Sequence, residues 1–240
     1  ARLSLTNCSL ARLVSAGSLC LAFGLGLPVG GALAAELDPP PGAIPRQGWI
    51  DGLLDGVRAA TEGLEWSDER VVGDWRVQRR VGDAASRGRI LNPADEVVAE
   101  GSVADCLATF DRLRQQRQIP AIAGEVVLVL HGLGESRRAM QPLVDHLQRG
   151  LDATVMTFGY ASPRAGLATH AGALARVLAG LPDITGVSFV GHSMGNLVVR
   201  RWLGVADPRS ISRIRRMVML GPPNQGSDLA RLAAGNSLLT

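Results

Sequence analysis

Residues 187–196 read Val-Ser-Phe-Val-Gly-His-Ser-Met-Gly-Asn. The mostly apolar start of this stretch predicts a buried strand, and the apolar pattern over residues 196–203 predicts a helix. Between them, the pattern G-x-S-x-G at residues 191–195 predicts a sharp strand-to-helix turn, because its two glycines leave room for backbones that the turn brings together. Such a turn would expose the Ser193 hydroxyl as a nucleophile. An ordinary glycine-rich turn is the alternative interpretation.

A second motif follows another predicted strand. Residues 125–130, Glu-Val-Val-Leu-Val-Leu, form a continuous apolar run that is typical of a central parallel strand, and His-Gly-Leu-Gly follows at 131–134. The glycines allow the loop to turn a backbone N–H toward a substrate carbonyl. We therefore predict an oxyanion hole made by the N–H groups of Leu133 and Met194. His131 is expected to hold this loop by hydrogen bonding rather than to transfer a proton.

Strands and helices alternate through the second half of the chain. Strands are predicted at 125–130, 153–160, 187–190 and 216–220. Helices are predicted after Ser136, which is expected to cap the first of them, and at 166–181 and 196–203. This alternation predicts right-handed crossovers and an α/β fold with a doubly wound, mostly parallel sheet. Ligands of such sheets bind beyond the carboxyl ends of the strands.

The region before that sheet, residues 49–123, is predicted to be a small α+β prefix. Its expected elements are a short helix at 49–64, a strand at 75–81 that continues into segments at 88–91 and 96–99, and a second helix. Ser102 and Asp105 form a capping box at the start of that second helix. Cys106 lies on its apolar pattern and is interpreted as a buried structural thiol. No motif in the prefix indicates a chemistry.

The N-terminus has the pattern of an export signal. Residues 13–27 are apolar, and Ala32-Leu33-Ala34 gives the small-x-small pattern that signal peptidase accepts. We expect residues 1–34 to be a signal peptide cut after Ala34 and residues 35–48 to be a Pro/Gly-rich linker. The mature protein would then be secreted or periplasmic. An N-terminal membrane anchor is the alternative, because the charge-free run approaches the length of a membrane span.

Composition excludes several classes of function. The 25 basic and 22 acidic residues leave a net charge of +3, and aromatic residues make up only 4%, which argues against nucleic-acid binding. Every basic residue is Arg, so Schiff-base and P-loop lysine chemistry are excluded. The four histidines form no metal-binding motif, and we expect no metal site.

Residues from about 124 to 240 resemble the α/β-hydrolase superfamily, in its bacterial lipase and esterase branch. The resemblance lies in Val-Leu-His-Gly-Leu-Gly at 129–134, Gly-His-Ser-Met-Gly at 191–195 and Gly-Pro-Pro-Asn-Gln-Gly-Ser at 221–227. It implies hydrolysis of carboxylic esters or lipids through a Ser-His-Asp triad, with an acyl-enzyme on Ser193 and no cofactor. The implied partner is a small-molecule or lipid ester, with transient contact with a lipid surface; the oligomeric state is left open. Asn196 departs from the family pattern, which often has a tiny residue there, and we expect slightly looser packing.

The order of the catalytic residues is the larger departure. In this fold the chain order is Ser, then Asp or Glu, then His, but all four histidines (131, 146, 170 and 192) precede Ser193. Asp207 and Asp228 suit a turn and the first turn of a helix. We therefore expect the triad acid and His beyond residue 240, a partial hydrolase domain over residues 124–240 that stops after about the fourth core strand, and little activity from the 240-residue chain alone. A non-catalytic pseudo-hydrolase, or an acyltransferase or amidase on the same fold, is the alternative.

Overall fold

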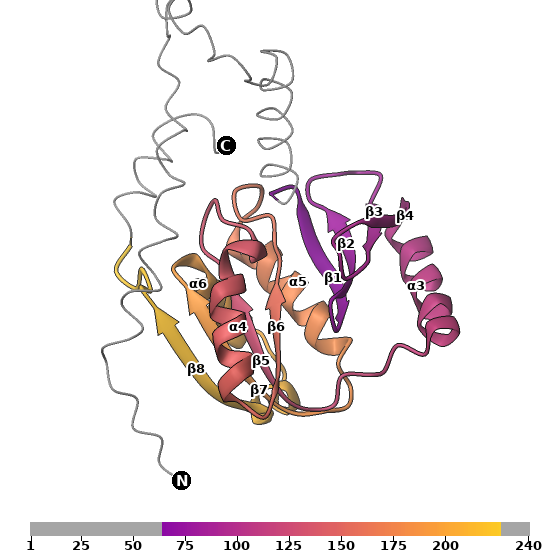
Figure 1. Cartoon of the computed structure of the whole chain (residues 1–240). Coiled ribbons are helices and arrows are strands. Elements are labelled where there is room, and N and C mark those ends of the chain that lie inside the picture. Colours follow the sequence, from indigo (N-terminus) through magenta and orange to yellow (C-terminus); the bar gives the residue numbers. More distant parts are fainter. Residues whose placement is uncertain (1–63, 227–240) are drawn as a thin grey trace, which may run out of the picture. The chain divides into compact units, whose positions relative to one another are not determined.

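The computed structural model describes residues 64–226, which lie in one compact unit and form two four-stranded sheets (Figure 1). The expected signal peptide and linker, and all but Leu64 of the first expected helix, lie outside the described residues. Within residues 64–226, no helix is long and apolar enough to cross a membrane. The domain boundaries given above stay predictions.

The first sheet, sheet A, is antiparallel. Its strands run in chain order: β1 (Trp66–Val72), β2 (Trp75–Arg80), β3 (Arg87–Leu91) and β4 (Val97–Ser102). Helix α3 (Val103–Arg117) packs on the apolar face of sheet A, where a core cluster contains Trp75, Cys106 and Phe110. The Ser102 hydroxyl accepts the N–H of Asp105 at 3.1 Å, so the predicted helix start is confirmed. Cys106 is buried, as expected of a structural thiol.

Strand β1 was not expected from the sequence. Its residues Trp-Ser-Asp-Glu-Arg-Val-Val contain a run of polar side chains, which hides the alternation typical of a half-buried strand. In the structure Ser67, Asp68 and Glu69 are nevertheless buried. They are buried because they have polar partners: the Asp68 N–H donates to the Gly159 carbonyl at 2.8 Å, and the Ser67 hydroxyl accepts the N–H of Ala161 at 3.0 Å.

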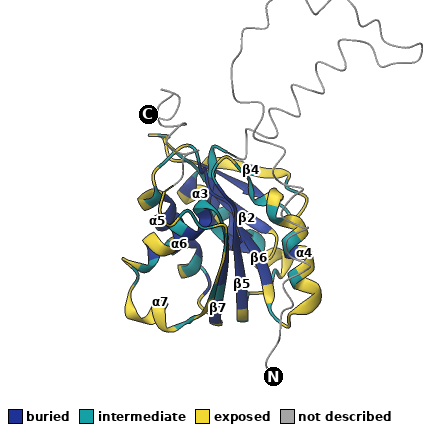
Figure 2. Cartoon of the chain, turned by 90° about the vertical axis from the view of Figure 1, so that its left-hand side faces the viewer, coloured by how far each residue is buried: buried dark blue, intermediate teal, exposed yellow. Residues whose placement is uncertain are grey.

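The second sheet, sheet B, is parallel. Its strands are β5 (Gly124–Leu130), β6 (Thr154–Phe158), β7 (Ile184–His192) and β8 (Ile214–Leu220), in the order β6-β5-β7-β8. Helix α4 (Gln141–Gly150) covers one face, and α5 (Leu167–Ala179) and α6 (Met194–Leu203) cover the other (Figure 2). The prediction of a doubly wound parallel sheet is confirmed for the described residues.

Alternate residues of β5 supply two separate cores. Val126, Leu128 and Leu130 belong to the cluster that includes α5 and α6, whereas Val127 and Val129 belong to the cluster that includes Val144 of α4. A strand covered on both faces needs apolar residues at every position, which explains the unbroken run in the sequence. Leu130 pairs with Gly191 of β7, so the segments that follow β5 and β7 leave the sheet side by side.

Two local predictions need correction. Ser136 precedes a short 3₁₀ helix, η2 (Arg137–Met140), rather than α4, and its side chain makes no capping hydrogen bond. Helix α4 instead begins after Met140 and has a proline in its first turn, where the missing N–H costs nothing. A short helix, α7 (Pro208–Ser212), also follows α6 and was not expected. Asp207 caps it, since its carboxylate accepts the N–H groups of Arg209 and Ser210.

Candidate active site

The turn between β7 and α6, residues 191–195, is called the β7 elbow below. Ser193 has a φ of +48° and a ψ of −117°, a backbone conformation that residues with a side chain rarely adopt. Its N–H donates to the Leu220 carbonyl of β8 at 2.9 Å. The side chain of Ser193 is partly exposed rather than buried. This is the sharp turn that the sequence predicts, at the carboxyl end of a central strand.

The two glycines of the β7 elbow stand where a Cβ atom would collide with the turn. A Cβ at Gly191 would lie 2.5 Å from Asn196 Oδ1, and one at Gly195 would lie 2.8 Å from the His131 carbonyl oxygen. Both distances are too short for real contacts. The glycines are therefore a steric requirement of this elbow, which argues against an ordinary flexible turn.

Asn196, expected from the sequence to loosen the packing slightly, lies in the first turn of α6 directly after the elbow. The residue is fully buried, and its side-chain amide donates to the carbonyls of Ser193 at 3.1 Å and Leu220 at 3.4 Å. These hydrogen bonds join the first turn of α6 to the elbow and to β8. Asn196 thus stabilises the strained backbone at Ser193 through side-chain hydrogen bonds that a glycine or alanine could not make.

The loop that follows β5, residues 131–135, is called the β5 loop below. His131 anchors it. The His131 ring is buried and stacks on Tyr160 with ring centroids 4.2 Å apart, and its Nδ1 lies 2.9 Å from the Gly132 carbonyl oxygen. The Tyr160 hydroxyl donates to the His131 carbonyl at 2.6 Å. Burial lowers the pKa of His131 to about 4, so the ring is neutral at neutral pH and its structural role agrees with the prediction.

The β5 loop lies against the nucleophile. A Cβ at Gly132 would lie 3.2 Å from the Ser193 Cβ. Gly134 has a φ of +71°, which a glycine adopts without strain, and its N–H donates to the Ser162 hydroxyl at 2.9 Å. Within residues 64–226, the N–H groups of Leu133 and Met194 donate to no other residue. The two predicted oxyanion donors therefore lie on two adjacent segments and are unused.

Glu135 and His192 form a pair that sequence reasoning missed. The Glu135 carboxylate accepts the N–H of Gly132 at 2.8 Å, and the same oxygen lies 2.9 Å from Nδ1 of His192. The hydrogen bond with Glu135 raises the pKa of His192. No motif marks Glu135; the only available signal was an acidic residue directly after His-Gly-Leu-Gly.

The other two histidines lie apart from Ser193. His146 is exposed on α4, and His170 is fully buried on α5 with its ring 4.9 Å from that of Tyr160. All four histidines of the chain are among the described residues, and none of them hydrogen-bonds the Ser193 hydroxyl. Asp207 is occupied as the cap of α7, and Asp228 lies outside the described residues. Between residues 64 and 226, no cluster of His, Cys, Asp and Glu side chains could hold a metal ion.

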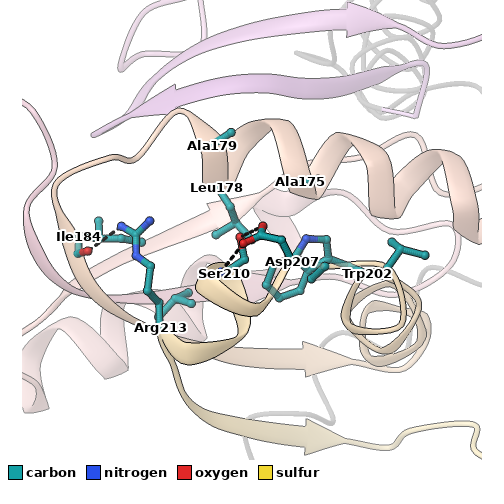
Figure 3. A pocket seen from close by; sticks show the side chains of 11 residues that line it. Ala175, Leu178, Ala179, Ile184, Trp202, Asp207, Ser210 and Arg213 are labelled. Carbon is teal, nitrogen blue, oxygen red and sulfur yellow. Dashed lines mark hydrogen bonds between the residues drawn. The ribbon is translucent and has the colours of Figure 1, made fainter.

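A well-formed cavity of the described region lies away from Ser193. It has a volume of about 400 Å³ and is lined by residues of α5, α6, α7 and the first half of β7, including Ile184, Trp202 and Arg213 (Figure 3). Ile184 begins β7, whereas Ser193 follows its end, which at about 3.3 Å per residue separates them by roughly 30 Å. The Arg213 guanidinium donates to the Leu181 and Ile184 carbonyls at 2.9 and 2.6 Å, so it is occupied by structural contacts.

Taken together, the described residues form an α/β protein with a serine held at a strained turn beyond the end of a central parallel strand. Residues 125–240 match the family model of the alpha/beta hydrolase fold. This match supports placing that part of the chain in the α/β-hydrolase superfamily, whose members are mostly hydrolases. No curated protein matches the chain.

Proposed function

We propose that the protein is an exported serine hydrolase that acts on carboxylic esters or lipids. The observation that carries the proposal is the conformation of Ser193, with its φ of +48°, beside a loop whose Gly132 approaches it closely. A strained backbone is stable only where its surroundings enforce it, and here Gly191, Gly195 and Asn196 do so. Such strain is typical of a serine that must project from the sheet toward a substrate.

In the proposed reaction, the Ser193 oxygen adds to the ester carbonyl carbon while a general base takes its proton. The carbonyl oxygen becomes an oxyanion, which accepts hydrogen bonds from the N–H groups of Leu133 and Met194. Removal of one such donor costs on the order of 3 kcal/mol of transition-state stabilisation. The intermediate then expels the alcohol, which receives the proton from the base, and water releases the acid from the acyl-enzyme in a second round. Helix α6 begins at Met194, so its N-terminus also favours the developing negative charge.

The triad acid and base are proposed to come from residues beyond Thr240. His131 is buried and held by Gly132 and Tyr160, while His192 is held by Glu135. These contacts support structural roles for both residues. A serine without its base is a weak nucleophile, and loss of a triad member costs on the order of 10⁴-fold in rate. The 240-residue chain alone is therefore expected to be nearly inactive.

Export is proposed from the N-terminal sequence, with cleavage after Ala34 and a secreted or periplasmic product. The rival is an N-terminal membrane anchor. N-terminal sequencing of the protein from its host separates the two: a chain that begins at Ala35 supports cleavage, and a chain that retains residues 13–27 supports the anchor.

Hydrolysis of p-nitrophenyl esters of increasing acyl length by the full-length protein tests the function. We expect hydrolysis that falls by about 10⁴-fold in the Ser193→Ala variant. Ser212→Ala serves as the matched control, because Ser212 is an exposed serine of α7. Binding of esters without turnover would support the pseudo-hydrolase instead, and transfer of the acyl group to an added alcohol or amine in preference to water would support an acyltransferase.

A further inference from the structure

Glu135 joins the β5 loop to the β7 elbow through one oxygen atom. Its Oε2 accepts the Gly132 N–H at 2.8 Å and lies 2.9 Å from Nδ1 of His192. The Glu135 N–H in turn donates to the Gly132 carbonyl at 3.4 Å, so the two residues close the β5 loop on itself. Leu133, a predicted oxyanion donor, lies within this closed turn.

The partner of Glu135 lies directly before the nucleophile. His192 is the last residue of β7, and Ser193 is the next residue along the chain. At Gly132 a Cβ would lie 3.1 Å from Glu135 Oε2, 3.1 Å from His192 Nδ1 and 3.2 Å from Ser193 Cβ. The carboxylate, the imidazole and the nucleophile therefore converge on the backbone of Gly132, and a side chain there would make unusually tight contacts with all three.

The charges around Glu135 come from few groups. Among residues 64–226, the titratable side chains that interact with it are His131 of the β5 loop, Tyr160 after β6 and His192 of β7. Burial lowers the pKa of His131 and raises that of Tyr160, so both are neutral near pH 7. His192 is then the only one of the three whose pKa is shifted toward the protonated form, the form that would place a positive charge against Glu135. Burial raises the Glu135 pKa, but the hydrogen bonds from His192 and Gly132 outweigh this effect and lower it.

An ionised Glu135 lies beside the proposed oxyanion hole, and protonated His192 would neutralise its negative charge. An unpaired carboxylate near the site would repel the negative charge that develops on the substrate. A protonated His192 neutralises that carboxylate and also holds it in place. Because the hydrogen bond that His192 donates to Glu135 raises the His192 pKa, the ion pair persists to higher pH than an isolated histidine would allow.

We propose that Glu135 is a positioning residue of the hydrolase reaction: through protonated His192 it holds the β5 loop against Ser193, with the Leu133 N–H directed at the oxyanion. This inference rests on the proposed function. In this proposal Glu135 does not contact the substrate, and Glu135 acts only through the position of the β5 loop. When the pH rises through the His192 pKa, the imidazole loses its charge, the carboxylate is no longer neutralised, and the turnover rate falls.

The test uses the full-length protein and its Glu135→Gln variant, which keeps the side-chain size and removes the charge. We expect kcat for a p-nitrophenyl ester to fall roughly 10- to 100-fold, with KM changed by less than about twofold, because only the transition state is affected. The alkaline decline of kcat in the native protein should disappear from the variant. In the same variant the NMR titration of His192 should move to a lower pKa.

Glu125→Gln is the matched control. Glu125 pairs with Arg215 at 3.1 Å at the opposite end of strand β5, and both side chains are exposed. It should leave kcat, the pH profile and the His192 titration unchanged. An unchanged kcat in Glu135→Gln, or a loss of kcat with the native pH profile, overturns the positioning role while the Ser193 nucleophile stands. If the native protein hydrolyses no ester, the proposed function fails and the positioning role fails with it.

Discussion

Among residues 64–226, two groups of buried polar side chains differ in charge. Where β1 and β2 of sheet A meet the end of β6, the buried groups include an ion pair: Arg76 donates to Asp68 at 2.5 Å, and the exposed fractions of the two side chains are 3% and 0%. Around the ends of β5 and β7 the buried groups are neutral, namely His131, Tyr160 and Asn196.

The difference follows from what each place must do. The Asp68–Arg76 pair is surrounded by further hydrogen bonds, since Asp68 also accepts from Gln78 and Gly159 and Arg76 donates to Thr157. A buried charge is tolerated where every partner is fixed, and here the pair fixes β1 against sheet B. Beside Ser193, fixed buried charges would compete with the charge that develops during a reaction. There the fully buried groups are neutral, and the charged Glu135–His192 pair is partly exposed and carries no net charge as a pair.

Removal of Asp68 should give the largest loss of stability. In Asp68→Ala the Arg76 guanidinium stays buried without its carboxylate, and we expect the free energy of unfolding to fall by about 3–5 kcal/mol. Urea denaturation measures this change. The control is again Glu125→Gln, whose exposed pair with Arg215 is expected to contribute less than about 1 kcal/mol. Equal losses in the two variants would mean that the buried pair does not fix β1.

Acid should destabilise the neutral site through His131. Its pKa in the folded protein is about 4 against an ordinary value of 6.5, so the unfolded chain binds a proton that the folded protein excludes. The contribution of neutral His131 to the free energy of unfolding is fully present above about pH 6.5. It is lost as the pH falls toward 4, by about 3 kcal/mol in total. Denaturation curves at pH 7, 5.5 and 4.5 test this.

His131→Asn should remove that part of the pH dependence, whereas His146→Gln, at an exposed position of α4, should retain it. The same pH slope in the native protein and in His131→Asn would show that His131 is not held neutral by burial.

Substitution of a glycine of the β7 elbow should cause a smaller loss of stability. Gly195→Ala places a Cβ 2.8 Å from the His131 carbonyl oxygen, and overpacking of this kind costs about 1–3 kcal/mol. Gly172→Ala in α5 is the matched control, because its Cβ has only an ordinary contact, at 3.6 Å from Arg176, and alanine favours the helix by about 0.5–1 kcal/mol. The change in the free energy of unfolding should therefore have opposite signs in the two variants, with Gly195→Ala destabilised and Gly172→Ala stabilised. Destabilisation by both variants to the same extent would contradict the steric account of the elbow.

Sheet B could be predicted from the sequence and sheet A only in part, for a physical reason. The unbroken apolar run of β5 and the glycines around Ser193 are local signals, because each residue there satisfies a local demand of burial or of backbone geometry. Strand β1 was missed because its buried Asp68 is explained only by partners that the fold supplies: Arg76 and Gln78 on the neighbouring strand β2, and Gly159, which is 91 residues away.

The same reason limits what could be predicted at the candidate site. Ser193, Leu133 and Met194 follow from two short motifs. Glu135 becomes meaningful only when the fold brings it to His192, which lies 57 residues further along the chain. Tyr160 and Ser162, which hold the β5 loop, come from the segment after β6 and carry no sequence signal of that role.

The central claim is that Ser193 is an activated nucleophile. Its most direct test is reaction of the full-length protein with a fluorophosphonate, followed by mass-spectrometric mapping of the modified residue. We predict rapid modification of Ser193, none in Ser193→Ala, and a rate lower by about 10³-fold or more in the 240-residue chain alone. Absence of modification in the full-length protein, or modification of a different residue, would contradict the account.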